Sequence, residues 1–218
     1  KSAIPLDSRR TRLAGYAATM KDERADWDKA LADMSAPMNP AHIAAACRKV
    51  FAPDSVLVVD GGNAAVWAMF YHHVSVPNTV VSTFKFGMLG AGTSQAVAAA
   101  LARPGKPVCC IIGDGAMGFH SQEVETAIRN KAQVVYIVLC DKQWGMVKMN
   151  QQFMLRPFKT MLFKHLDPDE TIKADLGEIE FDKLGQAMGA HGERVSDPKQ
   201  LKPALQRAIQ SGRCAVIH

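Results

Sequence analysis

The chain has 218 residues, of which 48% are hydrophobic and 22% are charged, a composition typical of a globular protein with one main domain. No apolar run approaches the roughly 20 residues needed to cross a bilayer, so neither a membrane span nor a signal peptide is expected, and a cytoplasmic location is predicted. The net charge of +5 is scattered and forms no basic stripe with aromatic residues, which argues against nucleic acid as a partner.

The first 38 residues are expected to be a linker segment. Residues 10–34 are charged and favour a helix, and their apolar side chains recur at spacings of three, four or seven, which predicts a surface or connecting helix. The simplest interpretation is a linker helix packed on the domain that it precedes. A proline-rich stretch follows, in which Asn39 is a good N-cap for a helix running to about Phe51. We therefore divide the chain into a linker, residues 1–38, and a domain, residues 39–218.

Beyond Phe51, short apolar runs rich in β-branched residues alternate with helical patterns. Strands are expected at residues 55–60, 79–82, 107–112, 133–140, about 191–195 and from 214 onward, and helices at 64–72, 89–102, 120–130, 181–188 and 198–210. This order predicts an α/β fold with a doubly wound, mostly parallel sheet and helices on both faces. Residues 154–180 are the least regular and are predicted to form a mobile active-site loop.

Carboxylates follow two of these predicted strands. Gly113-Asp114-Gly115 comes directly after the run 107–112, and Asp141 follows the next strand. Parallel strands end at the same edge of a sheet, where ligands bind in open α/β folds, so the two carboxylates are expected to lie close together. Hard oxygen ligands at this edge suit Mg²⁺ shared with phosphate oxygens. The triplet alone is commonly just a tight turn, and its pairing with Asp141 is what favours a metal diphosphate site.

A second glycine-rich loop, Asp60-Gly61-Gly62-Asn63, ends the first predicted strand of the domain and opens a helix. Glycines let backbone N–H groups approach a phosphate closely, and the N-terminus of a helix favours negative charge. Asn63 is therefore a candidate phosphate donor, although a role as N-cap explains it almost as well.

From about Asn39 to its end, the chain resembles the C-terminal diphosphate-binding domain of thiamine diphosphate-dependent enzymes, in the group that contains acetolactate synthase, benzoylformate decarboxylase and oxalyl-CoA decarboxylase. The family motif is Gly-Asp-Gly followed further on by Asn-Asn, where this chain has Cys140-Asp141. The resemblance implies that Asp114 and Asp141 bind Mg²⁺ by their side chains and Gln143 through its main-chain carbonyl. Aspartate instead of asparagine adds a negative charge, which should tighten metal binding and repel the diphosphate.

The segment Phe86-Gly-Met-Leu-Gly-Ala-Gly92 resembles the family segment beneath the thiazolium ring. The resemblance implies that Leu89 is the hydrophobic wedge that bends the cofactor, its contribution to catalysis, and that Gly87 and Leu89 meet the aminopyrimidine through backbone groups. An ordinary core leucine in the first turn of a helix is the alternative. The resemblance assigns cofactor contacts to Gly62, Asn63, Gly87, Met88, Leu89, Gly113, Gly115, Ala116, Gly145 and Met146.

The same resemblance implies an acetolactate synthase-like enzyme that depends on thiamine diphosphate and Mg²⁺ and acts as a 2-keto acid decarboxylase and carboligase. This chain would supply the diphosphate- and metal-binding half of the site. In the family, the activating glutamate lies in a pyrimidine-binding domain, which no part of this chain matches. That partner domain is expected from the same longer chain or from a second subunit, in a homodimer or homotetramer.

Two alternatives stay open. The Gly-Gly-Asn loop and Asp141 favour an oxalyl-CoA decarboxylase or 2-hydroxyacyl-CoA lyase with an acyl-CoA substrate, whereas Trp-Gly-Met-Val-Lys at residues 144–148 favours the acetolactate synthase-like enzyme and a small 2-keto acid. The other alternative is a non-catalytic cofactor-binding or assembly module.

The histidines and cysteines carry no metal signature. No histidine has HxxxH or Cys/His spacing, and His120, just after the metal turn, falls nearest to the predicted site. The five cysteines are odd in number and form no CxxC pair, so reduced thiols are expected. Because the chain opens on Lys1 without a methionine and stops at His218 within an apolar run, we expect the intact polypeptide to be longer.

Overall fold

A six-stranded parallel sheet forms the centre of the domain in the computed structural model, which describes residues 5–162, 167 and 170–218. The strand order is β2-β1-β3-β4-β6-β5, and each neighbouring pair is parallel. The strands are β1 (Leu57–Asp60), β2 (Val80–Ser82), β3 (Val108–Gly113), β4 (Val134–Leu139), β5 (His191–Glu193) and β6 (Ala215–Ile217). The prediction of an α/β fold with a mostly parallel sheet is therefore confirmed.

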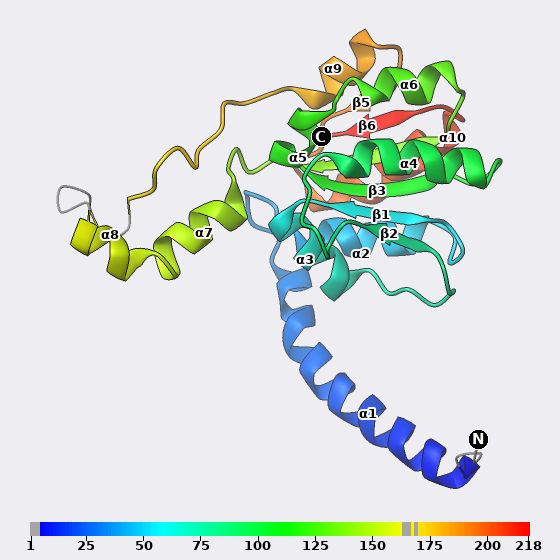
Figure 1. The fold of residues 1–218 in the computed structure, drawn as a ribbon. Coiled ribbons are helices and arrows are strands. Elements are labelled where there is room, and N and C mark those ends of the chain that lie inside the picture. The colour runs from blue at the N-terminus through cyan, green and yellow to red at the C-terminus, as the bar shows by residue number, and fades with distance from the viewer. Residues whose placement is uncertain (1–4, 163–166, 168–169) are drawn as a thin grey trace.

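Helices cover both faces of the sheet (Figure 1). Successive strand residues alternate between the faces, so that Val58, Cys110 and Tyr136 pack on one side and Leu57 and Cys109 on the other. The first side carries α4 (Ala91–Ala102), α5 (Asp114–Phe119), α6 (Glu123–Arg129) and α9 (Phe181–Ala187), and the second carries α2 (Ala41–Val50), α3 (Gly62–Tyr71) and α10 (Pro198–Gln210). Because both faces are covered, the strands are almost wholly apolar, which is why short apolar runs predicted them.

The N-terminal helix projects away from the domain (Figure 1). Helix α1 spans Leu6–Trp27, and a 3-10 helix, η1, spans Asp28–Ala32. At its end, Trp27 packs edge-on against Phe70 with ring centroids 4.6 Å apart, and the Tyr71 hydroxyl donates to the Trp27 carbonyl. No residue of α1 is buried, and Tyr16 is 69% exposed, so the prediction of a helix packed on the domain is wrong for most of its length. None of the described helices combines the length and apolarity needed to cross a membrane.

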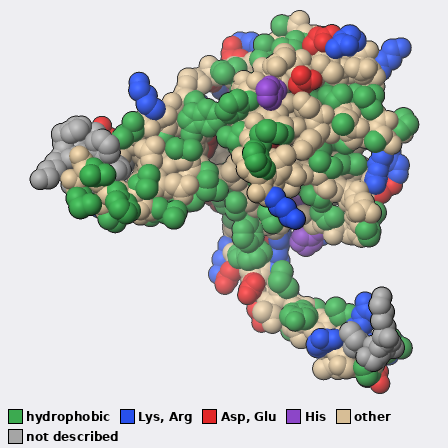
Figure 2. Space-filling view, viewed as in Figure 1, with side chains coloured by type: hydrophobic (Ala, Val, Ile, Leu, Met, Phe, Trp, Pro, Cys, Tyr) green, Lys and Arg blue, Asp and Glu red, His purple; other side chains and the backbone are tan. Residues whose placement is uncertain are grey.

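A second projection, here called the arm, consists of α7 (Gly145–Phe153) and α8 (Arg156–Leu162) (Figure 1). Hydrophobic side chains gather on the arm in Figure 2, and Phe153, Met154 and Leu162 are 75%, 70% and 67% exposed. The prediction of a loop over residues 154–180 is wrong at its start, because α8 is helical there. Residues 163–166 and 168–169 lie outside the described residues.

Candidate functional site

The carboxyl ends of β1 and β3 form the topological switch point of the sheet. The chain leaves β1 into α3 on one face and leaves β3 into α5 on the other face, so the two connections diverge. Ligands of open α/β folds bind in the crevice at such a point. The two strand ends approach closely, because a Cβ atom on Gly61 would lie 3.2 Å from the Gly113 nitrogen, and Gly61 has a φ of +100° that favours glycine.

A buried carboxylate connects β1 to the start of α4 beside this crevice. Asp60, which is 3% exposed, accepts hydrogen bonds from the Gly61 N–H (2.6 Å) and the Gly92 N–H (2.7 Å). A Cβ atom on Gly92 would lie 2.5 Å from Cβ of Asp60, so the contact requires glycine. No role for this carboxylate was predicted from the sequence. The available signal was an acidic residue at a strand end together with a later helix that has a glycine in its first turn.

Asp114 is the first residue of α5 and is 8% exposed. Its Oδ1 accepts from the Gly115 N–H (2.7 Å) and its Oδ2 from the Lys142 N–H (2.8 Å). Burial raises the pKa of Asp114, the two N–H groups oppose this effect, and the negative charge of Asp141 raises the pKa further. The helix predicted over residues 120–130 corresponds to α6, which begins three residues later at Glu123, whereas α5, which begins at the aspartate itself, was not predicted.

Asp141 lies in the short loop between β4 and α7. Its Oδ1 accepts from the Gln143 N–H (3.1 Å), and partial burial raises its pKa, against the lowering effect of that hydrogen bond. The Gln143 carbonyl accepts no hydrogen bond from the described part of the chain. Its neighbours do form backbone hydrogen bonds, because the Lys142 carbonyl accepts from the Leu176 N–H and the Trp144 N–H donates to the Ala174 carbonyl. Two carboxylates with raised pKa values and a free carbonyl oxygen form an oxygen-only donor set, which fits a hard divalent cation.

The N-termini of α3 and α7 meet at this donor set. A Cβ atom on Gly145 would lie 2.7 Å from Nδ2 of Asn63 and 3.2 Å from Oδ2 of Asp141, so the amide and the carboxylate converge on that glycine. A Cβ atom on Gly62 would lie 2.6 Å from Cβ of Met146. The N-cap of α3 is Gly61, and Asn63 lies within the helix, so the alternative role of Asn63 as N-cap is wrong.

The segment containing Leu89 lies over the end of α5. Leu89 is partly buried against the core on the α4 side of the sheet, but it precedes the helix, whose N-cap is Gly90, so it is not a first-turn residue. A Cβ atom on Gly90 would lie 2.6 Å from Cβ of Phe119 and 2.9 Å from Cδ2 of His120. Met88 is half exposed, and Gly87 has a φ of +69° with open space beside it. The segment therefore contacts the candidate site at Phe119 and His120, at the end of α5.

Two further predicted contacts lie within α5 itself. Ala116 is buried in the core, so only its backbone can face a ligand. Gly115 is covered by an indole ring, because a Cβ atom there would lie 2.6 Å from Cζ3 of Trp144. The Trp144 ring also packs on Phe119 with centroids 5.7 Å apart. Aromatic side chains therefore enclose the outer side of the Gly-Asp-Gly motif.

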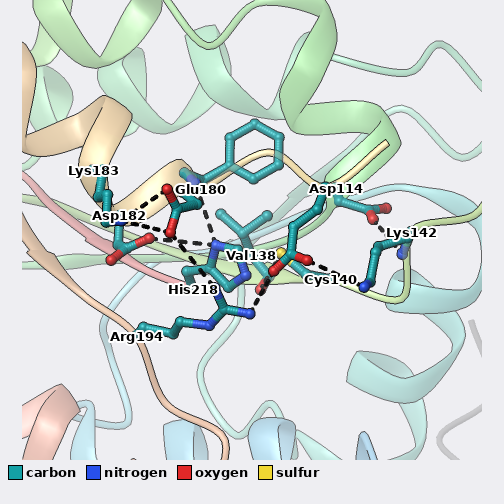
Figure 3. A network of polar contacts seen from close by, with 11 residues as sticks. Asp114, Val138, Cys140, Lys142, Glu180, Asp182, Lys183, Arg194 and His218 are labelled. Atoms are coloured by element: carbon teal, nitrogen blue, oxygen red, sulfur yellow. Dashed lines mark hydrogen bonds and ion pairs between the residues drawn. The ribbon is translucent and has the colours of Figure 1, made fainter. Parts of the chain in front are cut away.

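A cavity of about 350 Å³ adjoins Asp114 and Gly115 and was not predicted from the sequence. Its lining includes Phe119, Trp144, Phe181, Glu178, Arg194 and His218. Figure 3 shows the polar side chains of this region, with Asp114 and Lys142 at one end of the network and Asp182 and Lys183 at the other. The cavity adjoins Asp114, but its other polar lining residues, such as Glu178, Arg194 and His218, are not among the three oxygen donors described above.

His218 lines the inner wall of this cavity as a neutral acceptor. The Phe181 N–H donates to its Nδ1 (3.2 Å), and burial lowers its pKa. Asp182 lies 3.5 Å from the same nitrogen, but its Oδ1 receives no hydrogen bond in the described structure. No group of three His, Cys, Asp or Glu side chains capable of holding a metal occurs among the described residues, so a cation beside Asp114 and Asp141 would also need a main-chain oxygen.

Comparison with known proteins gives a consistent result. The family model described as "Thiamine pyrophosphate enzyme, C-terminal TPP binding domain" matches residues 60–218. A probable acetolactate synthase of Mycobacterium bovis is 32% identical over 202 residues, 92% of this chain and 35% of that protein. The acetolactate synthase of Bacillus subtilis is 30% identical over 193 residues, 88% of this chain and 30% of that protein.

Two other matches differ in their named activity. The 2-hydroxyacyl-CoA lyase 2 of Bos taurus is 28% identical over 179 residues, 82% of this chain and 26% of that protein. Among solved structures, the thiamine diphosphate-dependent 4-hydroxybenzoylformate decarboxylase of Rhodococcus jostii RHA1 superposes with a TM-score of 0.70 and 25% identity, over 85% of this chain and 33% of that one. The chain spans about a third of the length of the relatives that it matches.

Proposed function

Since the chain belongs to the thiamine pyrophosphate enzymes, through their C-terminal TPP-binding domain, we propose that it holds the diphosphate of thiamine diphosphate together with Mg²⁺ at the switch point between β1 and β3. The observation that carries the proposal is that the Asp114 carboxylate, at the start of α5, binds the loop that carries Asp141 and the free Gln143 carbonyl. The domain of residues 39–218 would perform this role, and residues 1–38 would be a linker.

The proposed metal ligands are Oδ of Asp114, Oδ of Asp141 and the main-chain oxygen of Gln143. Mg²⁺ takes a small number of protein oxygens and completes its shell with water and phosphate. Both carboxylates have pKa values raised by burial, and Asp141 adds to the effect on Asp114, so a bound cation would relieve the cost of keeping the pair ionised. Without a cation, the same two charges would repel a diphosphate.

The proposed diphosphate contacts are small or amide-bearing residues around the metal. Asn63 offers Nδ2 beside Gly145, where a larger side chain would collide with it. The other proposed contacts are Gly62, Gly113, Gly115, Ala116 and Met146, and the ring portion of the cofactor would meet Gly87, Met88 and Leu89. When bound, thiamine diphosphate supplies the electron sink for making or breaking a bond beside a carbonyl. The partly buried Leu89 would orient the cofactor as a hydrophobic support.

For the reaction, we propose an acetolactate synthase-like decarboxylation and carboligation of a small 2-keto acid. Support comes from relatives of 32% and 30% identity named acetolactate synthase and from Trp144 before Gly145-Met146. A 2-hydroxyacyl-CoA lyase-like reaction is the second candidate, supported by the relative of 28% identity and by Asp141. A pyrimidine-binding domain, from the same polypeptide or from another subunit of a cytoplasmic homo-oligomer, would complete either site.

Calorimetric titration with thiamine diphosphate, with and without Mg²⁺, tests the proposal. Metal-dependent binding that is lost in the Asp114→Ala variant is expected. If the cofactor binds equally well without metal, the metal assignment is wrong, and if the intact enzyme also fails to bind, the site is wrong. Turnover of pyruvate against an acyl-CoA by the intact enzyme separates the two reactions. Absence of turnover with either substrate class would favour a non-catalytic module.

A further inference from the structure

The loop that carries the proposed metal ligands contains a strained residue. Lys142, between Asp141 and Gln143, has a φ of +57°. A side chain with a Cβ atom is uncommon in this left-handed region and persists there only where its surroundings fix the backbone. The surroundings of Lys142 therefore determine how its two neighbours are presented.

A short extended segment, here called the strap and formed by residues 174–178, fixes the backbone of this loop. The Leu176 N–H donates to the Lys142 carbonyl (2.7 Å), and the Trp144 N–H donates to the Ala174 carbonyl (2.8 Å). Ala174 is itself buried in the domain. With the hydrogen bond from the Lys142 N–H to Asp114, both backbone polar groups of Lys142 are used.

The last residue of the strap holds the Lys142 side chain as well. Oε2 of Glu178 lies 3.2 Å from Nζ of Lys142, and Oε1 accepts from Nη2 of Arg194 (2.6 Å). Arg194 directly follows β5, so the Glu178 carboxylate connects the loop after β4 to the edge strand of the sheet. Single surface ion pairs contribute little, but here the strap already orders the partners, so less side-chain entropy is lost.

We propose that Glu178 is a positioning residue for the metal-binding loop: by holding the Lys142 ammonium, it keeps Asp141 and the Gln143 carbonyl directed at the cation. The inference rests on the proposed function. Lys142 directly follows Asp141 in the chain, so a released ammonium group would be free to approach that carboxylate, where it would compete with Mg²⁺ for the same negative charge. Glu178 thus acts on metal affinity without touching the metal.

The test compares two glutamate variants of the full chain. Glu178→Gln removes the charge that holds Lys142, whereas Glu180→Gln is the matched control, because the Glu180 carboxylate pairs with Lys183 (2.7 Å) and Arg194 (3.9 Å). In Mg²⁺ titrations with thiamine diphosphate present, we expect the Mg²⁺ dissociation constant to rise about fivefold in Glu178→Gln and to stay unchanged in the control. Hydrogen exchange of residues 140–146, measured without metal, should be faster in Glu178→Gln only.

A double variant separates positioning from a general structural effect. If Glu178 acts through Lys142, then adding Glu178→Gln to Lys142→Met should leave the Mg²⁺ dissociation constant of that single variant unchanged. A full fivefold effect in the Lys142→Met background, or wild-type Mg²⁺ affinity and exchange in Glu178→Gln, overturns the inference while leaving the proposed function intact. Failure of the unsubstituted chain and of the intact enzyme to bind Mg²⁺ overturns both.

Discussion

The backbone N–H of Lys142 donates a hydrogen bond of 2.8 Å to Oδ2 of Asp114. This bond joins the end of β3 to the loop after β4, so the carboxylate that begins α5 also orients the loop that carries Asp141 and Gln143. A carboxylate oxygen has a second lone-pair direction, and Asp114 can therefore hold the loop and still bind a cation. Changes at Asp114 should affect both functions at once.

Asp114→Ala removes a proposed metal ligand and the acceptor for two backbone N–H groups, those of Gly115 and Lys142. We expect Mg²⁺-dependent cofactor binding to weaken by more than about a hundredfold, beyond the range found for residues that only support ligands. Calorimetry measures the loss. Asp7→Ala is the control, since Asp7 is fully exposed on α1, and an equal loss there would point to an unrelated cause.

Asp141→Asn keeps an oxygen ligand but removes one negative charge. We expect Mg²⁺ affinity at neutral pH to fall about tenfold, because the attraction between the cation and the carboxylate is lost. The pH dependence should also change. Burial raises the pKa values of Asp114 and Asp141 above 3.8, so protons compete with Mg²⁺ as pH falls into the window above that value, and affinity declines with acidification.

In the Asp141→Asn variant, one competing proton is removed, so Mg²⁺ affinity should decline less steeply as pH falls into the range where the carboxylates titrate. Mg²⁺ titrations from neutral pH down to the lowest pH at which the protein stays folded measure this slope. An unchanged slope would mean that Asp141 does not bind the metal. If both the slope and the affinity match the unsubstituted chain, the choice of aspartate at this position has no role in metal binding.

The sheet was predictable from the sequence for a physical reason. Strands buried on both faces must be apolar throughout, and runs such as Val108–Ile112 and Val134–Val138 leave few alternatives. The helix over residues 10–34 was predicted, but its exposure was not, since apolar spacing on a projecting helix does not ensure burial. The start of α5 at Asp114 was missed because Gly-Asp-Gly is also typical of turns.

The site was predictable only where it depends on strand ends. The ends of β3 and β4 are neighbours in the sheet, which brings Asp114 and Asp141 to one edge as predicted. The cavity residues Glu178, Arg194 and His218 come together because β6 inserts between β4 and β5. Chain order does not reveal that insertion. The strap likewise forms hydrogen bonds with the loop after β4, and residues 154–180, from which it comes, show no hydrophobic periodicity that would predict this pairing.

Gly145→Ala tests whether Asn63 and Asp141 meet for a functional reason. The added Cβ would lie 2.7 Å from Nδ2 of Asn63 and 3.2 Å from Oδ2 of Asp141, displacing both from the proposed cofactor. We expect about a tenfold loss of Mg²⁺-dependent cofactor affinity, since small misplacements of positioned groups are costly. Thermal stability should not fall, because alanine is the better helix former at the start of α7.

Gly118→Ala in α5 is the matched control for this glycine, since a Cβ atom there would meet nothing within 4 Å. Cofactor affinity should be unchanged in Gly118→Ala. Equal losses of affinity in the two variants would show that neither Asn63 nor Asp141 is specifically required, whereas a loss of stability confined to Gly145→Ala would indicate a packing role instead of a binding role.

Asp60→Ala is expected to lower the free energy of unfolding by about 2–4 kcal/mol, because the N–H groups of Gly61 and Gly92 lose their acceptor in a buried setting. Denaturant titration measures this change. Asp54→Ala, at an exposed carboxylate paired with Lys106, should change stability little. Gly61 also forms one side of the crevice. Because Asp60→Ala releases the Gly61 N–H, the variant should also bind the cofactor more weakly. A destabilised variant with full cofactor affinity would limit Asp60 to a structural role.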